Sequence, residues 1–587
     1  MKTLPRMVAC LALSCIAATA MAEVTNAALQ RLFDDERAFT WRADPLTATY
    51  DGVHTYDDRL PSVTPAAQQR RVEADREFLR RLRALERSAL PPQEQVSYDL
   101  FDFMVTQRLA LGSHREWRMP LTSDSGFHAD VLFMHEAANP RSTADYERYI
   151  ARLRDLPRYF DENIANMRQG LRDGFTLPAE ILAGISSVVA AEQFASPEDS
   201  PFFAPFATFP STVPEVDRPR LAAAGRAAIE REVLPAYARF QEFFEREYRP
   251  GARRTLAASD LPDGRAYYAD LVRYFTTMPE ATPDDVHRTG LAEVARIRTE
   301  MEAIIREVGF KGSFGEFLAF LRTDPQFYAR TPEQLLREAA WITREIDGRT
   351  TAYFGKLPRT PFTVKPVPDE LAPNYTGGRY NPGAVGAAGE YWVNTYALDK
   401  RPLYVLPALT LHEAVPGHHL QGALARELAG VPRFRLNFYP HAFGEGWGLY
   451  AEKLGEELGV YHTPYQRFGR LTYEMWRACR LVVDTGMHSQ GWSRQQALDF
   501  LAANTALSTH EIRTEVDRYI AWPGQALAYK VGELKILELR ARAEAALGER
   551  FDIRAFHDAV LANGGVTLPV LEQQIDEFIA GSGRAAK

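Results

Sequence analysis

The sequence contains very little cysteine. Of its three cysteines, Cys10 and Cys15 lie in the first 22 residues, and only Cys479 remains beyond them. One cysteine cannot form an internal disulfide, so the chain beyond these residues must depend on a packed core. We expect Cys479 to be a small buried residue rather than a nucleophile. Cys15 resembles a lipoprotein site only faintly, because Ala12 and Leu13 fit that pattern poorly.

Long apolar runs are also missing. Residues 8–18 are mostly apolar but too short to span a bilayer, and no later stretch reaches about 18 apolar residues. Lys2 and Arg6 precede this run, and the small residues Ala20 and Ala22 follow it. This order predicts a signal peptide over residues 1–22, cleaved after Ala22, and therefore a periplasmic or secreted protein without a transmembrane segment.

The chain has no excess of positive charge. Its 69 basic and 77 acidic residues give a net charge of −8 and a pI near 6.0, which argues against a nucleic-acid partner. A hydrophobic share of 46% is ordinary for a globular protein. We expect a single large domain over residues 23–587, with an N-terminal helical half of about 23–355 and a second half of about 356–587.

Most of the sequence has helical spacing of its apolar residues. Thr282 followed by Pro283 is typical of a helix start. Residues 196–214 predict a surface loop or lid. Residues 484–489 are expected to interrupt the later helices, with His488 as a cap rather than a ligand. Helices are expected at residues 23–39, 66–90, 93–111, 142–173, 178–193, 218–248, 267–277, 283–308 and 331–354.

One region has a different composition. Prolines and glycines are dense in residues 356–389 and exclude a continuous helix. Residues 362–364 and 390–395 are strand-like in composition. The fold class is therefore mostly α, with a small β element directly before a histidine-rich segment.

That segment contains three of the 13 histidines, as His412-Glu413-Ala414-Val415-Pro416-Gly417-His418-His419. Imidazoles bind zinc, and a neighbouring carboxylate can act on metal-bound water, as in H-E-x-x-H helices. Here the fourth residue after His412 is Pro416, which cannot be a ligand. On an unbroken helix His418 points roughly 120° away from His412, and His419 lies about 10 Å further along the axis.

Pro416 and Gly417 offer a way to bring a second histidine back. Proline removes a helical hydrogen bond, and glycine relaxes the backbone. A two-residue bulge over residues 414–417 would place His418 as the second ligand, with His419 as the alternative. Both histidines could instead be bonded to backbone carbonyls, but their combination with Glu413 favours a metal site.

Glu445 is the candidate third ligand. The chain between His418 and Glu445 is long enough for the rest of one helix, a turn at residues 430–432 and the start of a second helix. Two histidines from one helix, a glutamate from the next and an open position for water are typical of a catalytic zinc site. Glu452 lies about two helical turns after Glu445, and we expect it at the surface or supporting a ligand rather than binding the metal.

Residues 411–421 and 443–452 resemble the DUF885 family, a bacterial group placed with the glutamate-zincin metallopeptidases. The strings HEAVPGHH and GEGWGLYAE carry this resemblance, which extends over most of the chain after the leader. The nearest characterised relatives are of the thimet-oligopeptidase and angiotensin-converting-enzyme types. The resemblance implies a large zincin-like helical shell around a deep channel, with the β element beside the metal helix.

The resemblance also implies roles for residues further along the chain. Arg518-Tyr519 is similar to an Arg-Tyr pair in the angiotensin-converting-enzyme relatives, whose tyrosine hydrogen-bonds the oxyanion. Tyr519 is therefore a candidate catalytic residue, and Tyr529 is the second candidate. Either tyrosine could equally be an aromatic residue of the core with its hydroxyl satisfied.

By the same resemblance, residues 391–395 would form an edge strand that aligns an extended substrate across the metal. Trp392 and Asn394 are the substrate-binding candidates on this strand. A small structural hairpin is the alternative interpretation.

These observations lead to one functional prediction: an exported zinc-dependent peptidase of short peptides. His412, His418 and Glu445 would hold Zn²⁺, and Glu413 would be the general base that takes a proton from the attacking water. Two alternatives stay open, a zinc hydrolase of another amide or ester and a non-catalytic binding protein that keeps the fold. The oligomeric state is open as well.

Overall fold

The computed structural model describes residues 26–123, 125–369, 372, 375–383 and 387–584. The predicted signal peptide and its cleavage after Ala22 lie outside the described residues. Within this part of the chain the fold is mostly α with a three-stranded sheet, which confirms the predicted fold class. None of the described helices combines the length and the apolar character that a membrane span requires.

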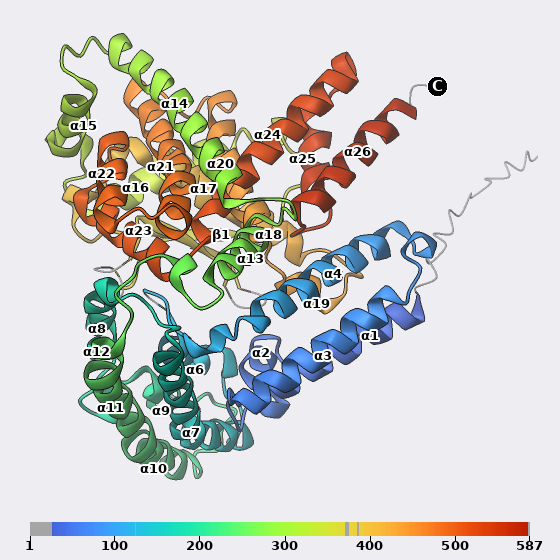
Figure 1. Cartoon of the computed structure of the whole chain (residues 1–587), viewed down its shortest axis with the longest axis vertical. Coiled ribbons are helices and arrows are strands. Elements are labelled where there is room, and N and C mark those ends of the chain that lie inside the picture. Colours follow the sequence, from blue (N-terminus) through green and yellow to red (C-terminus); the bar gives the residue numbers. More distant parts are fainter. Residues whose placement is uncertain (1–25, 124, 370–371, 373–374, 384–386, 585–587) are drawn as a thin grey trace, which may run out of the picture.

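The first thirteen helices form the part of the molecule drawn from blue to green in Figure 1, where α1, α3 and α4 lie side by side. Their bounds are α1 Ala27–Ala43, α2 Pro45–Tyr50, α3 Pro65–Arg83, α4 Pro92–Ser113, α5 Phe127–Asp130, α6 Met134–Ala138, α7 Thr143–Asp173, α8 Leu182–Ala191, α9 Ala204–Ala207, α10 Arg218–Ala228, α11 Leu234–Phe243, α12 Arg249–Gly251 and α13 Gly264–Thr276.

Most of the remaining helices gather in the other part of the molecule, around the sheet, whereas α19 lies against α1 near α4 (Figure 1). Their bounds are α14 Pro283–Glu307, α15 Phe314–Thr323, α16 Pro332–Asp347, α17 Leu406–Glu413, α18 His418–Arg426, α19 Arg433–Asn437, α20 His441–Glu457, α21 Pro464–Ser489, α22 Arg494–Asn504, α23 Thr509–Ala521, α24 Ala528–Leu547, α25 Ile553–Leu561 and α26 Leu568–Arg584. Helix α14 packs along α21, so the packing crosses the predicted division near residue 355.

Local side-chain chemistry starts several of these helices where the sequence predicts. The Thr282 hydroxyl accepts a hydrogen bond from the Asp285 N–H at 3.2 Å, so it caps α14 as expected. Ser142 and Asp145 bond each other's backbone at the start of α7 and form a capping box. Each cap satisfies backbone donors that would otherwise lack a partner.

Helix α21 is the buried axis of the second part. Almost every residue from Phe468 to His488 is buried, because other helices pack on all of its sides. The predicted interruption at residues 484–489 is wrong, since α21 continues through Ser489. A Cβ at Gly486 would lie 2.7 Å from the Trp492 ring, so glycine here serves close packing rather than a break. Cys479 is fully buried, as predicted.

The sheet consists of β1 Phe362–Pro366, β2 Gly378–Asn381 and β3 Gly389–Val393, in the order β1-β3-β2. Strand β3 pairs parallel to β1 and antiparallel to β2. The prediction that residues 391–395 form an edge strand is therefore wrong, because β3 has a neighbour on each side. The edge that contacts α17 is β2, which comes from the proline- and glycine-rich region.

Candidate metal centre

The histidine-rich segment is a complete break between two helices rather than a bulge within one. Helix α17 ends at Glu413 and α18 begins at His418, with a bend at Ala414 and a turn over residues 415–417 between them. The Trp447 indole donates a hydrogen bond to the Pro416 carbonyl at 2.8 Å and supports the connection. The break turns α18 so that His418 faces His412, with ring centres 4.7 Å apart.

Gly417 makes this break possible through close approach. A Cβ at this position would lie 1.9 Å from the carbonyl oxygen of His412 and 2.4 Å from that of Leu411. Both atoms belong to the backbone, so neither can move aside without displacing the end of α17. Any larger residue at position 417 must therefore push the two histidines apart.

We expect Gly417→Ala to lower the free energy of unfolding by about 3 kcal/mol, the upper range for overpacking a rigid site. Equilibrium urea unfolding measures this loss. Gly422→Ala in α18 is the matched control, because its Cβ would have 3.7 Å to the nearest atom, a ring carbon of Tyr380. Alanine favours a helix there, so the control should be neutral or stabilising. Equal stability of the two variants would contradict this account.

Glycines also bring α20 against α17. A Cβ at Gly448 would lie 2.6 Å from the His412 ring, so α20 contacts the imidazole with bare backbone. On its other side, α20 packs tightly along α24, where a Cβ at Gly532 would lie 1.8 Å from the Ala442 carbonyl oxygen. Within the GEGWG string, Gly448 thus lets α20 approach α17 closely, and Gly446 lets it approach Gly532 of α24.

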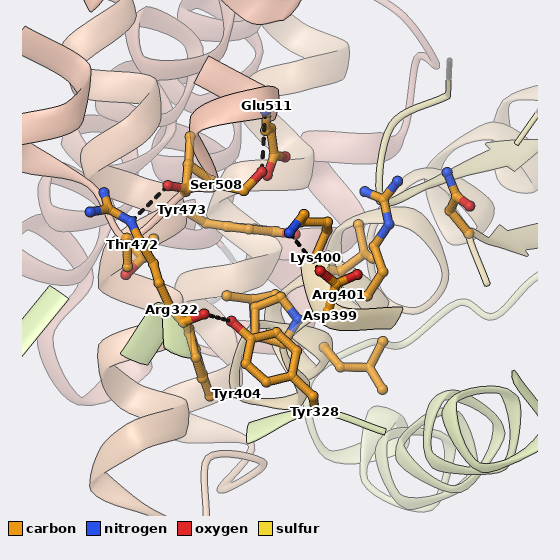
Figure 2. A pocket seen from close by; sticks show the side chains of 18 of the residues that line it. Arg322, Tyr328, Asp399, Lys400, Arg401, Tyr404, Thr472, Tyr473, Ser508 and Glu511 are labelled. Atoms are coloured by element: carbon orange, nitrogen blue, oxygen red, sulfur yellow. Dashed lines mark hydrogen bonds and ion pairs between the residues drawn. The ribbon is translucent and has the colours of Figure 1, made fainter. Parts of the chain in front are cut away.

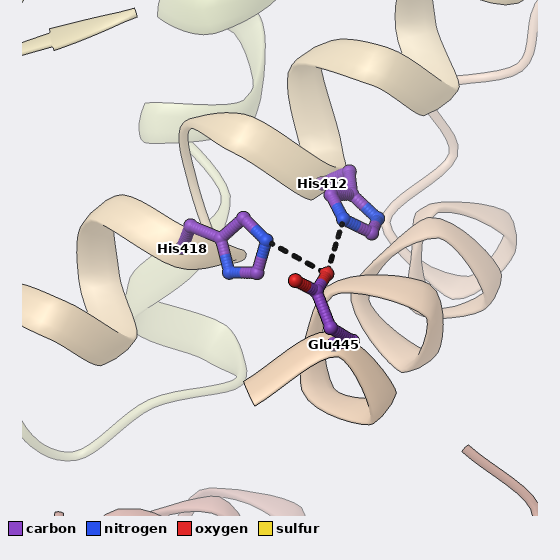
Figure 3. A group of neighbouring side chains, drawn as sticks. All are labelled: His412, His418 and Glu445. Atoms are coloured by element: carbon purple, nitrogen blue, oxygen red, sulfur yellow. Dashed lines mark ion pairs between the residues drawn. The ribbon is translucent and has the colours of Figure 1, made fainter. Parts of the chain in front are cut away.

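Three side chains converge at this place (Figure 3). Nε2 of His412 lies 3.6 Å from Oε2 of Glu445, and Nε2 of His418 lies 3.4 Å from the same oxygen. One ligand atom from each residue lies within 4.8 Å of the others, and the described residues contain no other such group of three. These three residues are the ones predicted from the sequence as metal ligands.

The geometry fits a zinc ion. Ligand atoms about 2.1 Å from a tetrahedral ion lie about 3.4 Å apart, which is close to the two His–Glu separations. Two imidazole nitrogens and one carboxylate oxygen are a donor set that zinc prefers, and three protein ligands leave one position for water. Zinc binding itself stays a prediction.

The electrostatics of the cluster favour a cation. Burial disfavours the charged form of His412, but hydrogen bonds to Glu445 and Glu452 and the charge of Glu413 outweigh it and raise its pKa to about 10. Burial likewise opposes ionisation of Glu445, yet its bonds to His412 and His418 hold its pKa well below the usual range. The surroundings of these groups therefore stabilise positive charge at their centre.

Glu452 contacts the first candidate ligand. Its carboxylate is buried and lies 2.8 Å from Nδ1 of His412, where it can accept a hydrogen bond from that nitrogen while Nε2 faces Glu445. Tyr461 donates to the Glu452 backbone carbonyl at 2.6 Å and anchors this part of α20. Of the two predicted positions for Glu452, the structure shows the supporting one.

Glu413 lies beside the cluster on the wall of a cavity of about 510 Å³. Its Oε2 accepts a hydrogen bond from the Tyr380 N–H of β2 at 2.8 Å, which orients the carboxylate. His412, His418 and Glu445 line the same cavity. The candidate general base and the candidate ligands therefore share one solvent space.

His419, the alternative ligand, points elsewhere. Its Nδ1 lies 3.1 Å from the Tyr380 hydroxyl, and its ring packs against Phe362 with centres 4.4 Å apart. Burial lowers its pKa to about 4, so this imidazole is neutral. Between the two histidines that the sequence left open, the structure brings His418 to the cluster.

Tyr519 does not reach the cavity, so the role predicted for it does not fit its position. Its hydroxyl is buried and accepts hydrogen bonds from Trp476 at 2.8 Å and Arg480 at 2.9 Å. Tyr529, the second candidate, does line the cavity, and its ring is stacked 6.4 Å from that of His412. Arg518 lines the cavity but Tyr519 does not, because successive residues of α23 face different sides. The resemblance to an Arg-Tyr pair therefore pointed to a segment that reaches the cavity, but to a tyrosine that does not.

The two substrate-binding candidates are also used within the fold. The Asn394 amide is fully buried and donates to the backbone carbonyls of Ala372, Tyr375 and Thr376. The Trp392 indole bonds the Glu390 carboxylate at 2.8 Å. Neither residue lines the cavity of the candidate ligands, whereas residues 378–380 of β2 do.

Sequence reasoning also missed a polar stripe on the buried helix α21. Arg470, Glu474, Arg477, Arg480 and Asp484 recur every three or four residues, which is the spacing of one helical face. All are buried. Charged residues at this spacing in an otherwise apolar helix are a signal for a buried polar site, and Arg477 and Arg480 line the cavity.

The fold and site together define a mostly α protein with a His-His-Glu cluster in a central cavity. A family model described as "Bacterial protein of unknown function (DUF885)" matches residues 45–575, so this chain belongs to the DUF885 family. A search of curated proteins found no match.

Two solved structures are similar to this chain. One is the putative lipoprotein from Colwellia psychrerythraea, with 27% identity and a TM-score of 0.87, covering 94% of this chain and 99% of that chain. The other is a putative lipoprotein of unknown function from Shewanella oneidensis, with 17% identity and a TM-score of 0.73. This second match covers 93% of this chain and 99% of the other and shows the fold alone.

Proposed function

We propose that this protein is an exported zinc-dependent peptidase that hydrolyses short peptides. The observation that carries the proposal is the convergence of His412 Nε2, His418 Nε2 and Glu445 Oε2 at tetrahedral ligand spacing beside the Glu413 carboxylate. The apolar segment at residues 8–18 and the likeness to a solved protein described as a lipoprotein support export.

Each residue of the site has a distinct task in this proposal. A zinc ion held by His412, His418 and Glu445 would supply Lewis acidity for the attacking water and the peptide carbonyl. Glu413 accepts the proton of that water and passes it to the leaving amine. The Tyr380 N–H, bonded to one oxygen of Glu413, keeps the other directed to the cavity. Tyr529 is the tyrosine within reach of a developing oxyanion.

The shape of the site favours small substrates. A cavity of about 510 Å³ holds a few amino-acid residues and excludes a folded protein. Among the described residues β2 pairs with a strand on one side only, and residues 378–380 line this cavity. Glu413 takes the outward Tyr380 N–H and Thr376 the Gly378 carbonyl, so an extended peptide can pair with the remaining backbone groups of this edge. The proposal therefore replaces β3 with β2 as the strand that aligns the substrate.

Metal removal tests the proposal. The purified protein is dialysed against a chelator, digested with a library of short peptides and analysed by mass spectrometry before and after one equivalent of zinc. We expect cleavage to be lost without metal and restored by zinc. Turnover only of other amides or esters would instead indicate the second kind of hydrolase. Metal-independent cleavage, or no turnover of any substrate, would refute the proposal.

A further inference from the structure

One wall of the metal-site cavity carries a cluster of arginines from β2, α21 and α23. Its members are Arg379, Arg477, Arg480 and Arg518, here called the arginine wall. They surround Tyr529: the guanidinium carbons of Arg477 and Arg480 lie 5.8 and 4.3 Å from its ring centre. Because the Tyr529 ring is stacked on His412, the arginine wall lies next to the candidate metal site.

The acidic groups near the arginine wall do not neutralise its positive charge. Glu515 is shared, at 2.8 Å from Arg480 and 3.5 Å from Arg518. Burial raises the pKa of Glu511 to about 7, so this carboxyl is only partly charged at neutral pH. No carboxylate of the described residues lies within ion-pair distance of Arg379, whose guanidinium stacks over a tyrosine ring at 5.2 Å.

Arg477 shows the deficit most clearly. Its side chain is 5% exposed, yet Nε has no hydrogen-bond partner in the described part of the chain. Its other nitrogens have only long contacts, 3.4 Å to the Tyr473 carbonyl and 3.5 Å to Glu452. A buried guanidinium with unmade bonds is costly, so the cavity favours an anionic ligand.

The neighbouring cavity is also lined by cations. It has a volume of about 180 Å³ and shares Tyr473 and Glu511 with the larger cavity (Figure 2). Its Arg322 donates to the backbone carbonyls of Leu507 and Thr505, and its Lys400 pairs with an aspartate. Its Arg401 has only long contacts, 3.4 Å to each of the Tyr396 and Tyr375 carbonyls. The arginine wall differs in that several of its guanidinium groups meet around one ring beside the candidate metal site.

We propose that the arginine wall binds a free carboxylate of the substrate, within about three residues of the bond that is cleaved. The inference rests on the proposed peptidase function and adds the substrate class. A planar guanidinium matches a carboxylate with two parallel hydrogen bonds. The His412 and Tyr529 ring centres are 6.4 Å apart, and the Arg480 guanidinium carbon lies 4.3 Å from the Tyr529 ring centre, so Arg480 is within about 11 Å of the His412 ring. An extended peptide advances about 3.3–3.6 Å per residue, so about three residues or fewer span this distance.

The source of the carboxylate is the C-terminus of a peptide or an acidic side chain near it. Both present the same planar anion, and the experiment separates them. Binding is measured by calorimetry on the zinc-loaded Glu413→Gln variant, which should bind without cleaving. Three versions of one short peptide are compared: the free acid, the C-terminal amide, and an amide with aspartate as its last residue.

We expect the free acid to bind about tenfold or more tightly than the plain amide, since bonds between charged groups are among the stronger ones. If the aspartyl amide matches the free acid, any nearby carboxylate suffices; if it matches the plain amide, the C-terminus is required. Equal affinity for all three peptides overturns the proposal.

Variants of the wall locate the effect. Arg379→Gln, at an exposed position that does not support the core, should reduce the acid-to-amide ratio to about one or two. Arg477→Lys keeps the charge but loses the planar fork, and should reduce the ratio in part. Arg426→Gln is the matched control, since Arg426 lines the same cavity but donates to the Pro382 and Gly383 carbonyls.

An unchanged ratio in both wall variants, or an equal loss in the Arg426 control, overturns the proposal. This result is separable from the function proposed above. Discrimination between acid and amide without any hydrolysis by the unaltered protein would refute the peptidase and keep the carboxylate site. Hydrolysis of acids and amides at equal rates would refute the carboxylate site and keep the peptidase.

Discussion

Replacing Glu413 with glutamine should abolish peptide hydrolysis and leave zinc binding intact. The amide keeps the shape of the carboxylate and can still accept the Tyr380 N–H bond of 2.8 Å, but it cannot take a proton from water. Loss of a general base lowers the rate about 10²–10⁴-fold, so the turnover number for a cleaved peptide should decrease by a factor in this range. The measurement pairs initial rates with metal content from the same preparation.

The control for Glu413→Gln is the same substitution at Glu427, a nearby carboxylate in the sequence that has no part in the proposed reaction. Glu427 follows α18 and bonds the backbone N–H groups of Arg359 and Thr360. Glu427→Gln should keep the rate of the unaltered protein within about twofold, because surface changes away from a site have small effects. A Glu413→Gln protein that cleaves at the parent rate would show that another group is the base.

His418→Ala should remove zinc binding, whereas His419→Gln should keep it. Nε2 of His418 lies 3.4 Å from Glu445, while His419 contacts Tyr380 and Phe362 instead. Loss of a direct ligand should weaken zinc by more than the 10–100-fold that is typical of residues which only support a ligand. Competition titration with a zinc-binding dye gives both dissociation constants.

The two variants are expected to lower the stability of the protein by different amounts. His419 is buried among aromatic rings, so His419→Gln is expected to lower the thermal midpoint without altering the zinc constant. His418 is partly exposed to the cavity, so its loss should affect stability less than metal affinity. If His419→Gln lost zinc while remaining folded and His418→Ala kept it, the ligand assignment would be reversed.

Much of the architecture could be predicted from the chain. Helical spacing, Thr282 as a cap and the proline-rich interruption correctly indicated a mostly α fold with a small sheet before the metal helix. These features depend on neighbours within a few residues, and local chemistry acts the same way in any fold. The interruption predicted at residues 484–489 is absent because this segment is packed on all sides within α21, where Gly486 lies against the Trp492 ring.

The site was predictable in its composition and less so in its orientation. The chain by itself determined which residue types could form a metal centre, since His412, His418 and Glu445 stand in a pattern with few other uses. Only the tertiary structure decided that His418 rather than His419 turns inward. The backbone at Gly417 passes so close to the His412 carbonyl that an added Cβ would lie 1.9 Å from its oxygen, and this close approach sets the direction in which α18 leaves α17. The tertiary structure likewise decided that Tyr529 rather than Tyr519 faces the cavity.

The arrangement of the strands and of the charged side chains was also decided by the tertiary structure. Which of two short strands lies at an edge depends on pairing between distant segments, and β2 reaches Glu413 only through the folded sheet. The arginine wall is assembled from β2, α21 and α23, which are far apart in sequence. Sequence therefore determined the chemical groups and the local helices, while long-range packing determined which groups meet, because side-chain direction is set by contacts that no local pattern contains.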